Sequence, residues 1–144
     1  MSRADVAPAD TERAVRIDLA AVRHNAGVLQ ERIRRPDGSR PLLTAVVKAD
    51  AYGHGAVAVA RAAAAAGADR LGVAHVREAL ALRAAGVRLP VLAWLHTGAT
   101  DFAAAVEAEV TLGVSGWDLD AVADAVRGLR ARGGAGPEAR AVLH

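Results

Sequence analysis

The spacing of hydrophobic and polar residues changes along the chain, and each change predicts a new element of secondary structure. From Leu19 to Ile33 the apolar residues lie three or four positions apart, the pattern of an amphipathic helix, and Asp18 stands at its expected N-cap. Residues 14–18 alternate between apolar and polar side chains and predict a short strand. Residues 42–48 form a β-branched apolar run, which is typical of a strand buried on both faces.

The strand pattern and the helix pattern then follow each other to the end of the sequence. Strands are predicted at residues 71–75, 90–95, 110–114 and 140–144, and helices at residues 56–68, 76–86, 100–109 and from Ser115 onward. A regular alternation of strands and helices implies parallel strands that are joined by right-handed helical crossovers. We therefore expect an α/β fold.

Two α/β architectures fit this alternation. A doubly wound open sheet would be complete within 144 residues, whereas an eight-stranded barrel needs about 250. No G-x-G-x-x-G motif follows the strand at residues 42–48, which disfavours the nucleotide-binding form of the open sheet. The sequence also stops within a predicted strand. We therefore expect the N-terminal half of a (β/α)8 TIM-type barrel with parallel strands at residues 14–144, ending before the barrel closes, and a flexible, polar N-terminus at residues 1–13.

Composition and charge exclude several classes of function. The chain has no cysteine, and its five histidines show no metal-ligand spacing, so a metal site has little support. The net charge is only +2 and aromatic residues make up 3%, which argues against a nucleic-acid partner. No apolar run approaches the roughly 20 residues that cross a bilayer, and the N-terminus lacks the apolar core of a signal peptide. We expect a cytoplasmic protein without a membrane partner.

The stretch VVKADAYGHG, residues 46–55, contains the only lysine and the only tyrosine of the chain, Lys48 and Tyr52. Every other residue among the 18 lysines and arginines is an arginine. A guanidinium stays protonated at physiological pH, whereas an amine can lose its proton and act as a nucleophile or base. The alternative is a lysine that only extends its charge into water from a strand end. Lys48 falls at the carboxyl end of a predicted strand, where barrel enzymes keep their chemistry.

This motif resembles the cofactor-lysine signature of the alanine racemases, a family of pyridoxal 5′-phosphate enzymes. The segment RAVRIDLAAVRHNAGVL resembles the opening segment of that family, and LGVAHVREALALRAAG resembles its second strand and helix. The resemblance covers about residues 14–144. It implies an isomerase that converts L-alanine into D-alanine for the cell wall and that forms a homodimer at full length.

The resemblance also implies roles for individual residues. Lys48 is expected to hold the aldehyde of the cofactor covalently and to serve as one of two bases at the substrate α-carbon. Tyr52 is expected to hydrogen-bond the cofactor phosphate, and Val46 to pack near the cofactor ring. The second base of the family is a tyrosine from the partner subunit, and a second, β-rich domain follows the barrel; the sequence contains neither.

Residues around the motif are expected in supporting positions. Asp50 and His54 should fix the loop through hydrogen bonds, and Trp94 and His96 end a predicted strand and could border the site, although tryptophan is more often a core residue and histidine more often solvated. Asn25, on the first predicted helix, is expected at the surface or between helices. Arg77 and Glu78 open a later helix and are expected to form an exposed ion pair.

Three other functions fit parts of this pattern. A non-catalytic, single-barrel carrier of pyridoxal phosphate would share the lysine, but such carriers resemble this chain only near that residue. Racemases of serine or lysine share the motif, so the substrate stays open between these amino acids and alanine. A plain α/β interaction domain would require the match to be accidental. The full ADAYGHG segment favours the alanine racemase reading.

Overall fold

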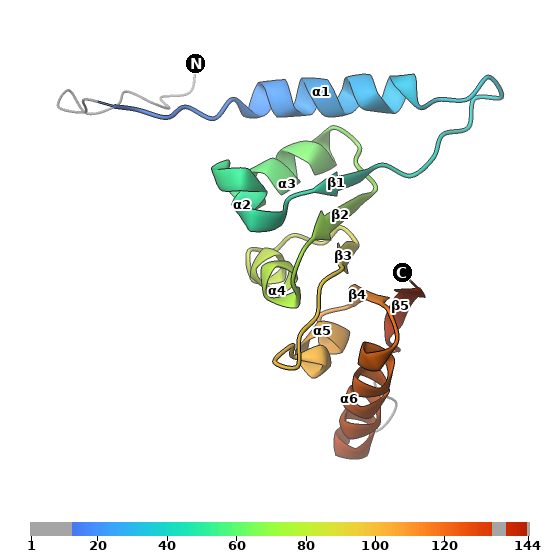
Figure 1. Cartoon of the computed structure of the whole chain (residues 1–144). Helices are drawn as coiled ribbons and strands as arrows, with labels where there is room; N and C mark the ends of the chain where they lie inside the picture. Colours follow the sequence, from blue (N-terminus) through green and yellow to red (C-terminus); the bar gives the residue numbers. More distant parts are fainter. Residues whose placement is uncertain (1–12, 134–137, 144) are drawn as a thin grey trace.

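The computed structural model describes residues 13–133 and 138–143, and these residues form one layered α/β unit (Figure 1). The helices are α1 Leu19–Arg32, α2 Lys48–Gly53, α3 Ala56–Ala65, α4 Val76–Ala84, α5 Phe102–Glu107 and α6 Trp117–Gly133. The strands are β1 Thr44–Val46, β2 Arg70–Val73, β3 Val91–Ala93, β4 Val110–Val114 and β5 Arg140–Leu143. Apart from Arg13, the N-terminal segment expected to be flexible lies outside the described residues.

The strands pair in the order in which they occur along the chain, β1-β2-β3-β4-β5, and every pair is parallel. A doubly wound sheet reverses its strand order at a switch point, whereas a barrel adds each new strand beside the previous one. The observed order has no reversal within the described residues. The expected half-barrel architecture is therefore confirmed.

The hydrophobic core lies between the sheet and the helices that cover one of its faces. Alternate residues of the central strands point toward the helices and are buried: Leu71, Val73, Val91, Ala93, Val110, Leu112 and Val114. They pack in one cluster with small residues of the helices, among them Ala60, Ala79 and Ala105. Alanine lets a helix approach the sheet closely, which explains the alanine-rich helices of this sequence. The opposite face of the sheet carries the remaining strand side chains.

Two predicted strands differ from the structure. Residues 14–18 form no strand, and Asp18 instead caps α1 by accepting hydrogen bonds from the N–H groups of Ala20 and Ala21 at 2.8 and 3.1 Å. A strand needs a neighbour to pair with, and the described sheet begins at β1. The strand expected at residues 42–48 is shortened to β1. The N–H of Val47 still donates to the carbonyl of Gly72 at 2.8 Å, and the chain then leaves the sheet at Lys48.

The first helix lies outside the helices that cover the sheet and packs against α3 (Figure 1). None of its residues is fully buried, although the predicted amphipathic helix and its N-cap are both present. The side chain of Gln30 reaches across and donates a hydrogen bond to the carbonyl of Gly67, just beyond the end of α3. The remaining predicted strands and helices are confirmed: β4 has the predicted bounds, β2 begins one residue earlier and ends two residues earlier, and the others are shorter. Asn25 is exposed on α1 as expected.

Candidate active site

The short helix α2, which follows β1, is left-handed in its interior. Ala49, Asp50, Ala51 and Tyr52 have φ values of 51°, 54°, 51° and 55°. For residues with a Cβ this conformation costs roughly 1–2 kcal/mol each, and it normally occurs at single positions rather than in a row. Since the sequence ADAY contains no glycine to relieve the strain, other parts of the molecule must hold this turn in place.

Asp50 and His54 stabilise part of this turn through hydrogen bonds within the loop, as expected from the sequence. The Asp50 carboxylate accepts a hydrogen bond from the N–H of Ala56 at 2.7 Å, at the start of α3. A ring nitrogen of His54, Nδ1, lies 2.8 Å from the carbonyl oxygen of Ala51. Both contacts stay within the loop, so these two side chains fix the path of the chain from the left-handed turn into α3.

Glu78, on α4, stabilises the left-handed turn from outside the loop. Its Oε1 atom accepts a hydrogen bond from the N–H of Ala49 at 2.6 Å, while Oε2 accepts from the N–H groups of Ala74 and His75 at 2.8 and 2.9 Å. The expected ion pair with Arg77 is therefore wrong: the carboxylate turns inward to backbone N–H groups, and Arg77 is exposed. Glu78 occupies the third position of α4, where a glutamate commonly turns back toward free backbone N–H groups, and this local signal could have identified it.

The hydrogen bonds to Glu78 also set its charge state. Burial raises the pKa of this carboxyl group, because a low-dielectric environment disfavours the ionised form. The N–H groups of His75, Ala49 and Ala74 act in the opposite direction and hold the net pKa below its ordinary value. The side chain is thus a carboxylate at neutral pH, which strengthens each of its three hydrogen bonds.

The left-handed turn brings the lysine and the tyrosine of the motif together. Lys48 is half-buried, and its Nζ atom lies 5.8 Å from the centre of the Tyr52 ring, within the range of a cation–π contact. Tyr52 itself is 70% exposed, so its hydroxyl group is available to a ligand. Both side chains follow β1 at the carboxyl edge of the sheet, the side on which the parallel strands end.

An apolar wall lies on the face of the sheet opposite to the helices. Val46 belongs to this face, is 49% exposed and pairs in register with Gly72. The ring of Trp94 lies over Gly72, where an added Cβ would come within 2.4 Å of its Cη2 atom and 3.3 Å of Val46 Cγ2. At Gly113, on β4, a Cβ would come within 3.3 Å of Trp94 Cδ1. The two glycines therefore make room for the indole, and Trp94 borders the site beside Val46.

His96 lies elsewhere. Its ring packs edge-on against Phe102, with 5.3 Å between the ring centres, and both ring nitrogens are buried. Phe102 belongs to the core between sheet and helices, so His96 faces away from the apolar wall. The expectation of a solvated histidine is wrong, because the phenyl ring at the start of α5 covers it.

The chemical character of the site follows from these groups. It offers one primary amine, one exposed phenol hydroxyl and an apolar wall, all at the carboxyl edge of parallel strands. Among the described residues, no cluster of three or more histidine, aspartate or glutamate side chains could hold a metal ion. In the same part of the chain, no helix has both the length and the apolar composition to cross a membrane.

Fold and site together define the class of protein: a β/α-barrel domain with a single lysine amine at the carboxyl end of its first strand. The family model described as alanine racemase, N-terminal domain, matches residues 17–143. The chain therefore belongs to the alanine racemase family.

Individual relatives agree with this assignment. The chain is 58% identical over 99 residues to an alanine racemase of Mycolicibacterium smegmatis, covering 69% of this chain and 24% of the relative. It is 54% identical over 112 residues to an alanine racemase of Mycobacterium ulcerans, covering 77% of this chain and 28% of the relative. The chain thus spans only about a quarter of the length of these curated relatives.

Solved structures are similar as well. The alanine racemase from Streptomyces coelicolor A3(2) superposes with a TM-score of 0.76 at 46% identity, covering 88% of this chain and 32% of that structure. The alanine racemase from E. faecalis gives a TM-score of 0.67 at 34% identity, covering 76% of this chain and 29% of that structure.

Proposed function

We propose that this chain forms the cofactor-lysine part of a pyridoxal-phosphate-dependent alanine racemase, a cytoplasmic isomerase that interconverts L- and D-alanine for peptidoglycan synthesis and works as a homodimer at full length. One observation carries the proposal: the only lysine of the chain is held at the carboxyl end of β1, with its amine 5.8 Å from the ring of the only tyrosine. Names of the relatives support alanine as the substrate rather than serine or lysine.

The groups at the site fit this cofactor. Lys48 would hold it through a covalent bond between Nζ and the aldehyde carbon, with loss of water. Tyr52 would donate its hydroxyl hydrogen to the phosphate, and Val46 with Trp94 would contact the aromatic ring. When bound, pyridoxal phosphate withdraws electrons from the substrate α-carbon and so acidifies its proton.

Lys48 would then move that proton. As a neutral amine, Nζ can take a proton from one face of the substrate and give it back, which a permanently protonated guanidinium cannot do. Racemisation needs a second base on the opposite face, and the sequence has no other lysine or tyrosine that could fill this role. We therefore propose that these 144 residues alone convert L-alanine into D-alanine negligibly. Supplying the remaining part of a full-length relative in trans is the informative comparison.

Reductive trapping tests the cofactor site directly. The purified chain is incubated with near-stoichiometric pyridoxal phosphate, reduced with borohydride, digested and mapped by mass spectrometry. The expected adduct is a secondary amine on Nζ of Lys48. Adducts confined to the N-terminal amine would refute the proposed function, because that amine is the only other primary amine in the chain.

A further inference from the structure

The carboxylate of Glu78 joins three segments of the chain that meet beside Lys48. One oxygen accepts the N–H of Ala49, directly after the lysine, and the other accepts the N–H groups of Ala74 and His75, between β2 and α4. Both oxygens are therefore engaged. The described ion pairs include neither Glu78 nor Lys48, so the carboxylate acts on backbone groups and not on the lysine charge.

The hydrogen bond from Ala49 to Glu78 acts on the peptide group that directly follows Lys48. The N–H of Ala49 belongs to the peptide plane between Lys48 and Ala49, and fixing that plane fixes ψ of the lysine and φ of the alanine. Ala49 is also the first of the four left-handed residues. A hydrogen bond to an ionised acceptor is roughly twice as strong as a neutral one, so this contact can offset a large part of the strain at Ala49.

We propose that Glu78 is the positioning residue for Lys48: by holding the N–H of Ala49 from the neighbouring β2–α4 junction, it aims the lysine side chain along the carboxyl edge of the sheet. This inference rests on the proposed role of Lys48 as the cofactor lysine. Glu78 touches no reacting atom in this arrangement. Its effect passes through the backbone, so its loss changes where the amine points.

The test compares Glu78→Gln and Glu78→Asp with Asp101→Ala in the full 144-residue chain. Glutamine has one carbonyl oxygen and an NH₂ group that cannot accept, so it leaves at least one of the three N–H donors unpaired. Aspartate is one methylene shorter and cannot span both junctions. Asp101 is the matched control, because its carboxylate also accepts a helix-start N–H at this edge, from Ala104 at 2.9 Å, but has no contact with the lysine turn.

The readout is the ratio of Lys48 adduct to N-terminal adduct after trapping with pyridoxal phosphate and borohydride. Both amines belong to the same molecule, so the ratio corrects for cofactor concentration and recovery. We expect Glu78→Gln to lower the ratio about tenfold, the effect of losing one hydrogen bond to a charged group. Asp101→Ala should leave the ratio unchanged, while Glu78→Gln and Asp101→Ala lower the melting temperature by similar amounts, because each loses helix-start hydrogen bonding.

The outcomes separate this inference from the proposed function. A wild-type chain labelled only at its N-terminal amine refutes the cofactor site itself. A wild-type chain that prefers Lys48, together with a Glu78→Gln variant of equal preference, refutes only the role of Glu78.

Hydrogen exchange on the unmodified chain tests the contact between Glu78 and the Ala49 amide even if the variants do not fold. Ala49 is exposed, yet its amide should be protected by Glu78, and this protection should weaken as acid protonates the carboxylate. Exchange of the Ala49 amide at the rate of an unstructured peptide would overturn the proposal.

Discussion

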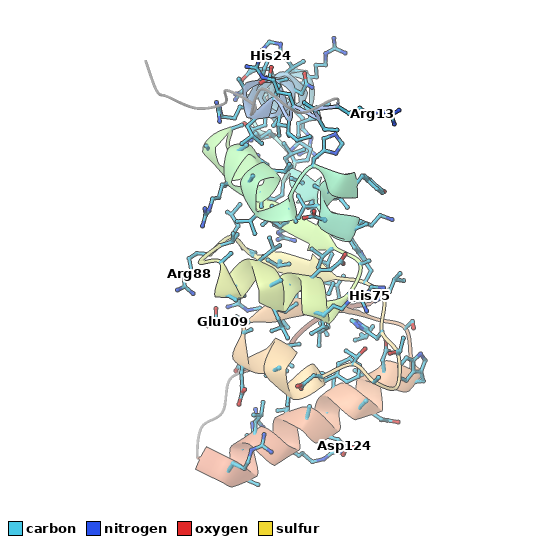
Figure 2. All side chains as sticks on the ribbon, turned by 90° about the vertical axis from the view of Figure 1, so that its left-hand side faces the viewer. Arg13, His24, His75, Arg88, Glu109 and Asp124 are labelled. Atoms are coloured by element: carbon cyan, nitrogen blue, oxygen red, sulfur yellow. The ribbon has the colours of Figure 1, made fainter. Side chains whose placement is uncertain are left out.

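The two edges of the sheet, where its strands begin and where they end, are held mainly by opposite kinds of side chain. At the carboxyl edge, carboxylates accept hydrogen bonds from backbone N–H groups: Asp50 from Ala56, Glu78 from Ala49, Ala74 and His75, Asp101 from Ala104, and Asp118 from Ser115 and Gly116. At the amino edge, arginines donate to backbone carbonyls. Figure 2 shows His75 at one edge and Arg88 with Glu109 at the other.

Arg83 is the main example at the amino edge. Its guanidinium donates to the carbonyls of Val87 and Leu89 at 3.0 and 2.7 Å, and to those of Ala108 and Glu109 at 2.9 and 3.3 Å. It thereby ties the loop before β3 to the loop before β4. Burial lowers the pKa of this guanidinium, so the four carbonyls have to replace the water that it lost.

The difference follows from the direction of the helices. In a β/α unit each helix begins near the carboxyl end of a strand, where its first N–H groups lack partners, and ends near the amino end of the next strand, where its last carbonyls lack partners. Carboxylates suit the first position and cations the second. Arginine, with five donors in a fixed fork, serves the amino edge better than lysine. The single lysine stands at the other edge, where the proposed function would use its amine for chemistry rather than for structure.

Replacing Lys48 at the carboxyl edge and Arg83 at the amino edge should give the largest effects. The first replacement should change cofactor labelling, and the second should change stability. Lys48→Arg should abolish the side-chain adduct with pyridoxal phosphate completely, because a guanidinium does not add to the aldehyde under these conditions. Since Lys48 is half-buried and makes no described ion pair, the free energy of unfolding should change by less than about 0.5 kcal/mol. Peptide mapping and denaturant unfolding measure the two quantities. A loss of stability as large as that of an Arg83 variant would contradict the division between the edges.

Arg83→Ala should have the opposite effects: it should lower stability and leave the labelling of Lys48 unchanged. Four carbonyls lose a charged donor, and we expect a loss of about 2–4 kcal/mol in the free energy of unfolding with an unchanged labelling ratio at Lys48. Arg83→Lys is the matched control: it keeps the charge, but a single ammonium group cannot reach both loops with the same geometry. Its stability should fall between those of Arg83→Ala and the wild type. Full stability in Arg83→Lys would mean that the charge alone matters.

This contrast was only partly visible in the sequence. The alternation of strands and helices predicted the sheet, its parallel order and the place of Lys48, because those features depend on local periodicity. The left-handed turn at residues 49–52 was not predicted, since its stability comes partly from Glu78, on another helix. Arg77 beside Glu78 suggested an ion pair, but three unpaired N–H groups are stronger competitors for a carboxylate than one exposed guanidinium.

The strand wrongly predicted at residues 14–18 and the position of His96 have the same cause. An alternating pattern shows only that a segment could pair as a strand. In the described sheet β1 is the first strand, and residues 14–18 do not pair with it. A histidine at a strand end is usually solvated, but here Phe102, six positions later, packs against its ring. Both outcomes depend on contacts that local patterns do not contain. By contrast, Trp94 and its two facing glycines follow from strand register once the sheet order is known.

A smaller effect is expected for Tyr52→Phe at the carboxyl edge. The hydroxyl would contribute one hydrogen bond to the phosphate, so cofactor retention should weaken by roughly 0.5–1.5 kcal/mol, with a larger loss if the phosphate charge strengthens the bond. Stability should not change, because the side chain is 70% exposed. The measurement is the concentration of pyridoxal phosphate that gives half-maximal labelling of Lys48. Equal concentrations for both proteins would make Tyr52 a packing residue only.

The smallest effect concerns acid sensitivity at the amino edge. The Asp69 carboxylate pairs with Arg40 at 2.6 and 2.9 Å and accepts the N–H of Leu43 at 2.8 Å. The hydrogen bond from Arg40, followed by that from Leu43, lowers the pKa of Asp69 from 3.8 to about 2. Because the folded-state pKa is the lower one, the unfolded chain takes up a proton first as pH falls.

The contribution of Asp69 to stability is therefore complete above pH 3.8 and is lost as pH falls toward about 2. Asp69→Asn removes the titrating group, so the difference in melting temperature between wild type and variant should shrink across this window and stay constant above it. The pair is partly exposed and screened by salt, so the difference should also shrink at high ionic strength. Trapping at Lys48 near neutral pH should be equal in the two proteins. A variant with altered trapping but the wild-type acid response would mean that the two edges are coupled and that Asp69 acts on the site instead of on the fold.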